Sequence, residues 1–424
     1  MKQKIKKSLI TLLCLPLLSL AQLTQTYVPD DNFEQELINL GYDNIMDNYV
    51  QTANINTVTV LDLNFKNISD LTGIEDFTSL NYFYCINNNI ASINTVNFTS
   101  IIEFYCDNNQ LSSLDVSSMT SLSYFSCTNN QISSLNLSNN LSLVNFYCDN
   151  NQLTSLDVNS NTYLSTFSCT NNQLTALSLI NNSWLDTLYC DNNQITALDL
   201  STDTALITLG CSGNLLSTLD FNNNNHLSSL YCSNNQITTL DFSNNFQLEE
   251  VYCSDNQIST MTFNSNSALT SLGCSNNYLY TIDVSSNNNL LYLFCSNNQI
   301  GDINVSYNPS LVLLNCENNS LYALDVRNGN NTNFISFSVL NNSNLYCINI
   351  DDSTWANINW FNIDSQHYFS NNCSSTTAVN DIFSERKLLR ITNLLGKECK
   401  ANSKEPLLYY YDDGTIEKKL IIQH

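Results

Sequence analysis

Twelve cysteines stand 21 residues apart between Cys85 and Cys316, and this spacing constrains the fold more than any other feature of the chain. Each cysteine is followed three residues later by Asn, and Leu or Ile stands five residues before it and five residues after it. A fixed period of this length is typical of a solenoid, in which each unit forms one turn of a coil and stacks on its neighbours. The series is Cys85, Cys106, Cys127, Cys148, Cys169, Cys190, Cys211, Cys232, Cys253, Cys274, Cys295 and Cys316.

The segment from Leu122 to Ile132 shows what one unit contains. Phe125 and Cys127 alternate with polar residues, which predicts a short strand that directs both side chains to the interior. Equivalent strands would stack in parallel, about 4.8 Å apart. Asn130 is placed to bond backbone groups that the turn leaves unpaired, so the repeated Asn would form a ladder. A second apolar pair closes the other side of each turn and leaves too few residues for a full helix.

The unit follows the pattern L-x-x-L-x-L-x-x-N-x-L with Cys in the third apolar slot, and so resembles the leucine-rich-repeat signature. Over about two thirds of its length the chain is similar to short-repeat bacterial surface proteins of the internalin kind. This resemblance implies a mostly-β horseshoe with a parallel sheet on the concave face and short turns or 3₁₀ segments on the convex face. We expect about 14 repeats, mostly of 21 residues, over residues 61–345, with Leu63 and Val339 in the cysteine slots of the outermost repeats.

Residues 1–21 have the parts of a signal peptide. Lysines precede an apolar run, and Ala21 supplies the small residue at the cleavage position, so the mature chain is expected to begin at Gln22. The run is too short to span a membrane, and no transmembrane segment is expected in the mature chain.

Residues 22–60 are expected to form an N-terminal cap. Asp30 and Asp31 can cap a helix that carries Phe33, Leu37 and Leu40 on one face. A solenoid needs such a cap because its first core layer is otherwise exposed.

Residues 346–378 depart from the repeat and are expected to form a C-terminal cap with a small cluster of aromatic residues. Cys347 and Cys373 lie off the 21-residue period, and two such cysteines in an exported protein favour a disulfide between them. The alternative is two separately buried thiols.

Residues 379–424 contain two β-rich runs around Asp413 and Gly414, which predicts a hairpin. The segment resembles the C-terminal sorting domain of type IX secretion substrates, on Gly396 and on the final strand with Lys418 and Lys419. The Pro-Asn-Pro strand that often opens that domain is missing. The resemblance implies the type IX secretion machinery as a partner and an exported protein, extracellular or on the outer-membrane surface. The alternative is a small β cap on the solenoid.

The distribution of charged residues along the chain limits which classes of molecule it is expected to bind. Between Gln22 and Ala378 the chain has 31 acidic residues and only Lys66 and Arg327 as basic residues. Nucleic acid and anionic lipid are therefore poor partners for this part, whereas a protein or glycan ligand on a cell surface remains. The simpler interpretation is that the acidic residues keep the protein soluble outside the cell.

The composition does not point to catalysis or to a cofactor. Parallel strands hold neighbouring cysteines too far apart for bridges, and a straight row of thiols does not converge on a metal. We therefore expect twelve free, buried thiols, no metal and no cofactor. The three histidines fit no ligand or nucleophile motif, so an enzyme ranks third among the functions. Calcium binding at the Asn and Asp turns stays a minor alternative, because the G-G-x-G-x-D pattern is missing.

The strand positions beside each cysteine are expected to face the concave side, where Tyr and Asp recur. Tyr offers contact area and a polar tip for recognising a protein or sugar. We expect a binding protein that acts in adhesion or another surface interaction; the alternative is a structural component of the cell surface without a specific ligand. The candidate ligand-binding residues are Tyr84, Tyr105, Asp107, Tyr147, Asp149, Tyr189, Asp191, Tyr231 and Tyr252.

Overall fold

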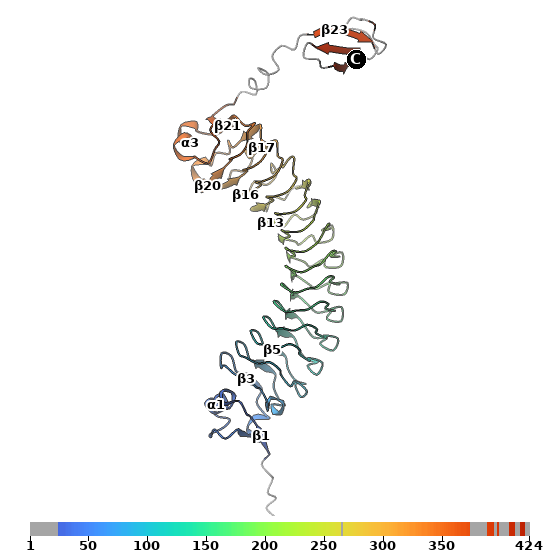
Figure 1. The fold of residues 1–424 in the computed structure, drawn as a ribbon, viewed down its shortest axis with the longest axis vertical. Coiled ribbons are helices and arrows are strands. Elements are labelled where there is room, and N and C mark those ends of the chain that lie inside the picture. The colour runs from blue at the N-terminus through green and yellow to red at the C-terminus, as the bar shows by residue number, and fades with distance from the viewer. Residues whose placement is uncertain are drawn as a thin grey trace, which may run out of the picture. The chain divides into compact units, whose positions relative to one another are not determined.

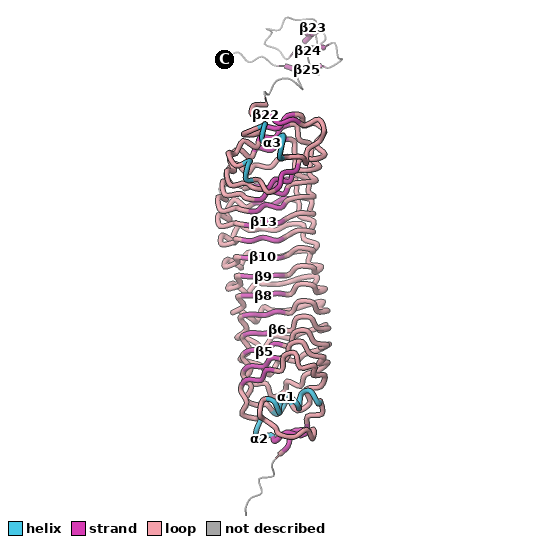
Figure 2. The backbone as a smooth tube through the Cα atoms, turned by 90° about the vertical axis from the view of Figure 1, so that its left-hand side faces the viewer, coloured by secondary structure: helices cyan, strands magenta, loops and turns pink. Residues whose placement is uncertain are grey.

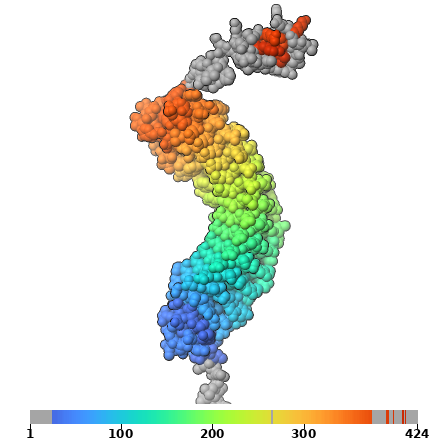
Figure 3. Space-filling model, in the orientation of Figure 1, coloured from blue at the N-terminus to red at the C-terminus, as the bar shows by residue number. Residues whose placement is uncertain are grey.

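The computed structural model describes residues 24–263, 266–373, 388–393, 397, 407–411 and 416–419. The chain divides into two compact units between Asn371 and Asn372, which lies ahead of the boundary expected at residue 379. The first unit is a curved coil whose turns succeed one another in chain order (Figures 1 and 3). Each turn therefore packs mainly on the turns before and after it.

A parallel sheet of 14 three-residue strands lines the concave side of the coil, as the repeat predicted (Figures 1 and 2). Neighbouring strands pair in register, so that Phe104 lies beside Phe125 and Phe125 beside Phe146. The strands are β3 (Val60–Asp62), β4 (Tyr82–Tyr84), β5 (Glu103–Tyr105), β6 (Tyr124–Ser126), β7 (Asn145–Tyr147), β8 (Thr166–Ser168), β9 (Thr187–Tyr189), β10 (Thr208–Gly210), β11 (Ser229–Tyr231), β13 (Glu250–Tyr252), β15 (Ser271–Gly273), β16 (Tyr292–Phe294), β18 (Leu313–Asn315) and β20 (Ser336–Ser338).

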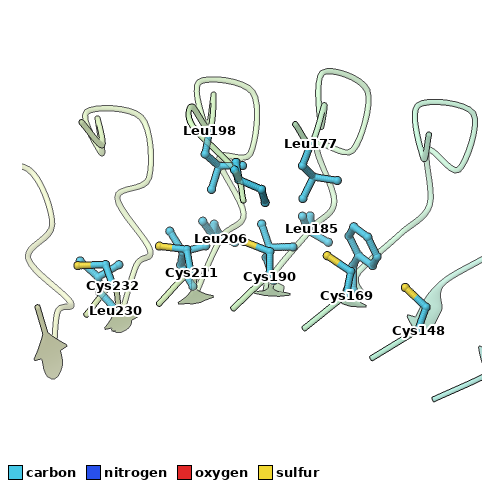
Figure 4. Packing of buried hydrophobic residues seen from close by; sticks show 14 of the residues in the cluster. Cys148, Cys169, Leu177, Leu185, Cys190, Leu198, Leu206, Cys211, Leu230 and Cys232 are labelled. Atoms are coloured by element: carbon cyan, nitrogen blue, oxygen red, sulfur yellow. The ribbon is translucent and has the colours of Figure 1, made fainter. Parts of the chain in front are cut away.

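The core of the coil consists of columns of like side chains. Phe125, Phe146 and Phe167 are fully buried and stack with ring centroids 5.4 and 5.5 Å apart. The cysteines form a second column, in which Figure 4 shows the sulfur atoms in a row. All twelve cysteines of the period are buried free thiols, which confirms the prediction. A free cysteine in this position acts as a small apolar side chain.

The Asn three residues after each cysteine holds successive turns together, as predicted. The Nδ2 of Asn151 donates to the carbonyls of Cys127 and Cys148, at 2.9 and 3.1 Å, and its Oδ1 accepts from the backbone of Ile132. The residue before it, Asn150, has a φ of 53°. Asn tolerates this left-handed conformation better than other side chains do, which explains why Asn is common at this position, whereas the hydrogen bonds between turns explain Asn151.

A second ladder of buried Asn runs along the convex side and was not anticipated from the sequence. Asn182 is representative: its Nδ2 donates to the carbonyls of Val158 and Asn161, at 3.1 and 2.9 Å. One member of the series is an aspartate, Asp203, which is completely buried, and neither of its carboxylate oxygens has a hydrogen-bond partner. The other members are Asn140, Asn161, Asn224, Asn245, Asn266, Asn287 and Asn308.

The convex side is mostly turns, as expected, but it differs in two respects. Among the described residues, 3₁₀ helix occurs only at η1 (Ile74–Asp76) and η2 (Asn331–Asn333). Short strands also pair on this side, where turns were expected, because a strand of three residues is too short to give a signal of its own in the sequence. These strands form two parallel sheets, β12 (Thr239–Asp241) with β14 (Thr260–Thr262), and β17 (Asp302–Asn304), β19 (Ala323–Asp325), β21 (Cys347–Asn349) and β22 (Tyr368–Ser370).

The N-terminal end is covered by helix α1 (Asp31–Asn39), short helix α2 (Thr52–Ile55) and the antiparallel strands β1 (Gln25–Tyr27) and β2 (Tyr49–Gln51). The side chain of Asp30 caps α1, and Phe33 and Leu37 are buried, as predicted. The prediction for Leu40 was wrong: it lies just after the last helical turn and is 42% exposed.

The C-terminal end of the coil is covered by α3 (Ser353–Asn359) and the aromatic cluster that follows it. The Trp360 ring stacks on Phe337 of the last concave strand at 3.9 Å, and so closes the core. Phe361, by contrast, is exposed. Cys347 and Cys373 are both disulfide-bonded, which excludes the alternative of two buried thiols.

The second unit contains strands β23 (Leu388–Asn393), β24 (Leu407–Tyr411) and β25 (Ile416–Lys419) in one antiparallel sheet. Leu408 of β24 pairs with Lys418 and Leu407 with Lys419, so the predicted hairpin strands do pair. Gly396, Asp413 and Gly414 lie outside the described residues, as do Ala21 and Gln22 of the predicted cleavage position.

Candidate ligand-binding surfaces

The tyrosines predicted to bind a ligand form one column on the concave face, at the third position of their strands. Most are half-buried, and Tyr189 is 36% exposed. Where two tyrosines are neighbours, their rings contact each other: the centroids of Tyr84 and Tyr105 are 5.5 Å apart, and those of Tyr231 and Tyr252 are 5.7 Å apart. The structure therefore places these residues on one face, as predicted.

Two tyrosines of this column, Tyr189 and Tyr252, are followed by glycine for a packing reason. The ring of Tyr189 leans over Gly210 so closely that a β-carbon added there would lie 2.5 Å from it. Tyr252 covers Gly273 in the same way, at 2.8 Å. The glycines thus let these two rings lie against the next strand.

Two tyrosines are fixed by glutamates of the next strand. The hydroxyl of Tyr84 donates to Glu103 at 2.9 Å, and that of Tyr231 donates to Glu250 at 2.7 Å. Partial burial and these carboxylates together raise the pKa of both hydroxyls to about 12, because each phenolate would be poorly hydrated and would face a negative charge. Both tyrosines are neutral hydrogen-bonding groups at physiological pH.

Asp107, Asp149 and Asp191 have a structural role that the sequence analysis did not recognise. The Asp149 carboxylate accepts from the Ser168 hydroxyl and from the backbone of Thr170 in the next turn, the latter at 2.7 Å. Asp107 accepts from Ser126 and Thr128 in the same way, and Asp191 from the backbone of Ser212.

Burial raises the pKa of all three carboxyls, while these hydrogen bonds oppose the increase. The alternation of Tyr-Cys-Asp with Ser-Cys-Thr between residues 105 and 191 is therefore explained by bonds between turns. One carboxylate oxygen of each residue accepts hydrogen bonds from the next turn, and ligand binding by these residues stays a prediction.

A second surface, also missed from the sequence, lies along the edge where the chain turns into the concave strands. We call it the strand-start edge: the residues seven, six and four positions before each cysteine. Most of these positions carry Ser, Thr or Asn, but a few repeats carry large apolar side chains that are 46–68% exposed. They are Leu141, Tyr163, Trp184, Ile207 and Phe246. Their offsets differ from repeat to repeat, so no periodic pattern reveals them.

Part of this edge is hollowed into an open depression of about 390 Å³. Four consecutive turns contribute its lining, so the depression exists only because the turns stack. It combines an apolar wall with a single carboxylate. The lining residues are Ile207, His226, Ser228, Phe246, Gln247, Glu249 and Ala268.

The structure offers no chemical site of another kind among the residues it describes. No group of three or more His, Cys, Asp or Glu side chains in these ranges is arranged to hold a metal. Burial raises the pKa of the Cys148 thiol well above its ordinary value, and a thiol of this kind is a poor nucleophile. His367 is buried in the cap, where its Nδ1 accepts from the backbone of Asp364.

The helices within the described ranges are all too short and too polar to cross a membrane.

Comparison with known proteins supports the fold. No protein-family model matches the chain, and no curated protein matches it. Among solved structures, the functional domain of InlJ from Listeria monocytogenes, which includes a cysteine ladder, shares 28% identity with the chain. The match covers 92% of this chain and 96% of that domain, with a TM-score of 0.68.

Two further structures agree in fold. The internalin InlF of Listeria monocytogenes shares 22% identity over 73% of this chain and 95% of its own, with a TM-score of 0.64. The leucine-rich effector YopM of Yersinia pestis shares 26% identity over 58% of this chain and 68% of its own, with a TM-score of 0.50. The chain is thus a leucine-rich-repeat solenoid with a parallel concave sheet, similar to structures of bacterial internalins.

Proposed function

We propose that this protein is a binding protein exported to the cell surface or beyond it, which recognises a protein or glycan through the concave sheet. The observation that carries the proposal is the tyrosine column. Its rings are half-exposed on a sheet whose backbone is already bonded from turn to turn. A rigid aromatic surface of this kind loses little conformational entropy when a ligand binds.

The similarity to internalin structures supports the same class of function, whereas the identity of the ligand and a role in adhesion belong to the proposal. Export through the type IX machinery belongs to it as well. It rests on the resemblance of residues 379–424 to a sorting domain, and the antiparallel pairing of β24 with β25 is compatible with that resemblance.

The test is binding of the purified protein to an array of glycans and surface proteins, beside a variant with Tyr105, Tyr147 and Tyr189 changed to Ser. We expect hits that the variant loses. The matched control changes Tyr278, Tyr280 and Tyr307 to Ser, since these tyrosines are 52–61% exposed away from the concave strands.

Hits that survive in the concave variant but not in the control would refute the concave site. An array without hits would favour a structural component of the surface over a binding protein. Export is tested separately, because removal of residues 379–424 should keep the protein inside the cell envelope.

A further inference from the structure

We propose that the depression at the strand-start edge binds an arginine or lysine side chain of a basic protein partner. This inference rests on the proposed binding function and adds to it a second contact surface and the chemistry of the partner. It concerns the wall made by Ile207 and Phe246 and the carboxylate of Glu249, which line the same hollow.

The shape and polarity of the depression fit a long cationic side chain. Ile207 and Phe246 are 46% and 55% exposed, and they offer an apolar wall to the alkyl stem of the partner's side chain. The Phe246 ring can also receive a guanidinium or ammonium group against its face. Glu249, three residues after Phe246, provides the negative charge at which the head of that side chain would end.

Glu249 is available for such a pair. It is exposed, and no salt bridge or side-chain hydrogen bond engages its carboxylate within the described residues. This separates it from Glu250 beside it, which accepts from the Tyr231 hydroxyl, and from Asp191, which accepts from Ser212. Those two carboxylates serve the scaffold, whereas Glu249 does not.

The repeat itself shows that these side chains are dispensable for the coil. At the position of Phe246 most other turns carry Thr, Ser or Asn, and at the position of Glu249 they carry residues as different as Ser, Val and Leu. Asn151, which bonds successive turns, has an equivalent in every repeat, whereas Phe246 and Glu249 do not. The exposed side chains of Phe246 and Ile207 line one hollow together, and an exposed apolar wall of this kind favours a contact surface.

The net charge of the coil indicates which kind of partner such a surface binds. The body between Gln22 and Ala378 has 31 acidic and two basic residues, so a second copy would be repelled, and so would an acidic partner. The acidic body attracts a basic protein as a whole, and the depression provides a specific binding site for one side chain of that partner.

The experiment measures binding of a fluorescent 12-residue peptide of alternating arginine and alanine to the purified protein in about 0.15 M salt, where general attraction is screened beyond about 8 Å. A second peptide has citrulline, which is neutral and similar in shape, in place of arginine. The variants are Phe246→Thr and Glu249→Gln. Their matched controls are Phe361→Thr, which removes an exposed aromatic in the cap, and Asp255→Asn, which removes one charge and restores the residue common at its position.

We expect Phe246→Thr and Glu249→Gln each to raise the dissociation constant about threefold or more, the controls to change it little, and the citrulline peptide to bind much more weakly. Equal losses for Glu249→Gln and Asp255→Asn would overturn the inference, since only net charge would then matter. Unchanged binding by Phe246→Thr would also overturn it. If the inference is overturned in this way while the concave tyrosine variant still loses its array hits, the proposed function stands and this inference alone fails.

Discussion

Asp203 interrupts the convex ladder of asparagines, and replacing it with Asn is expected to stabilise the protein. Asn182 and Asn224, one turn before and one turn after, each donate from Nδ2 to two carbonyls. In the same register Asp203 would meet the carbonyls of Leu179 and Asn182 with an oxygen rather than with a donor. Both of its oxygens are buried without partners, which is costly for a carboxylate.

The expected size of the stabilisation follows from the ionisation of Asp203. Burial, and to a lesser degree the charge of Asp199, raise the pKa of Asp203 from 3.8 to about 7. At about 1.4 kcal/mol per pH unit, a difference of about three units corresponds to about 4 kcal/mol. Relaxation of the coil and entry of water reduce such penalties, so we expect Asp203→Asn to raise the free energy of unfolding by about 2–4 kcal/mol at pH 8.

The sign of the pH dependence is fixed by the direction of the shift. The pKa of Asp203 is higher in the folded state than in the unfolded state. Its protonated form therefore contributes fully to stability below pH 3.8, and this contribution is lost as the pH rises to about 7. The advantage of Asp203→Asn should therefore be small at pH 4.5 and reach its full size at pH 8.

Thermal and urea unfolding at both pH values tests this expectation. Asn224→Asp is the matched control, since it creates the same defect one turn later and should destabilise the protein at pH 8. An advantage of Asp203→Asn that is missing at pH 8, or equal at the two pH values, would refute the reasoning.

Two further outcomes are expected. The twelve period thiols should resist alkylation by iodoacetamide at pH 8 in the native protein and react after unfolding, because burial raises their pKa; mass mapping that finds them labelled in the native protein, or bridged to one another, would contradict this. Asp149→Ala should destabilise the protein by about 2 kcal/mol, because it leaves the Ser168 hydroxyl and the Thr170 N–H without their acceptor. Asp157→Ala, which removes an exposed carboxylate that bonds only Asn159, should cost less than about 1 kcal/mol, and equal losses in urea unfolding would show that Asp149 has no special role.

The sequence was sufficient to predict the coil because the same residue pattern recurs in every turn. A strand of three residues, such as Tyr124–Ser126, is too short to predict alone, but the same pattern at every turn predicts the parallel sheet, the buried cysteines and the Asn ladder together. Each of these depends on a residue and its equivalent 21 positions away, and sequence comparison between turns reveals that relation directly.

Contacts between different positions of neighbouring turns could not be interpreted in this way. Asp107, Asp149 and Asp191 are predicted to bind a ligand, and the structure shows in addition that one carboxylate oxygen of each bonds the next turn. Phe246 and Ile207 stand at different offsets from the cysteine and give no pattern in the sequence, although stacking places them in one depression. A one-dimensional pattern does not show which side chains of different offset approach each other across neighbouring turns.

The sequence by itself therefore determined the architecture: the length of the turn, the direction of the strands, the interior columns and the caps at both ends. Only the tertiary structure decided which polar groups are satisfied. Asp149 has partners, Glu249 on the strand-start edge has none within the described residues, and Asp203 is buried without any. The physical reason is that apolar burial follows from the periodic composition of each turn, whereas hydrogen bonding depends on distances between atoms of successive turns, which exist only once the turns are stacked.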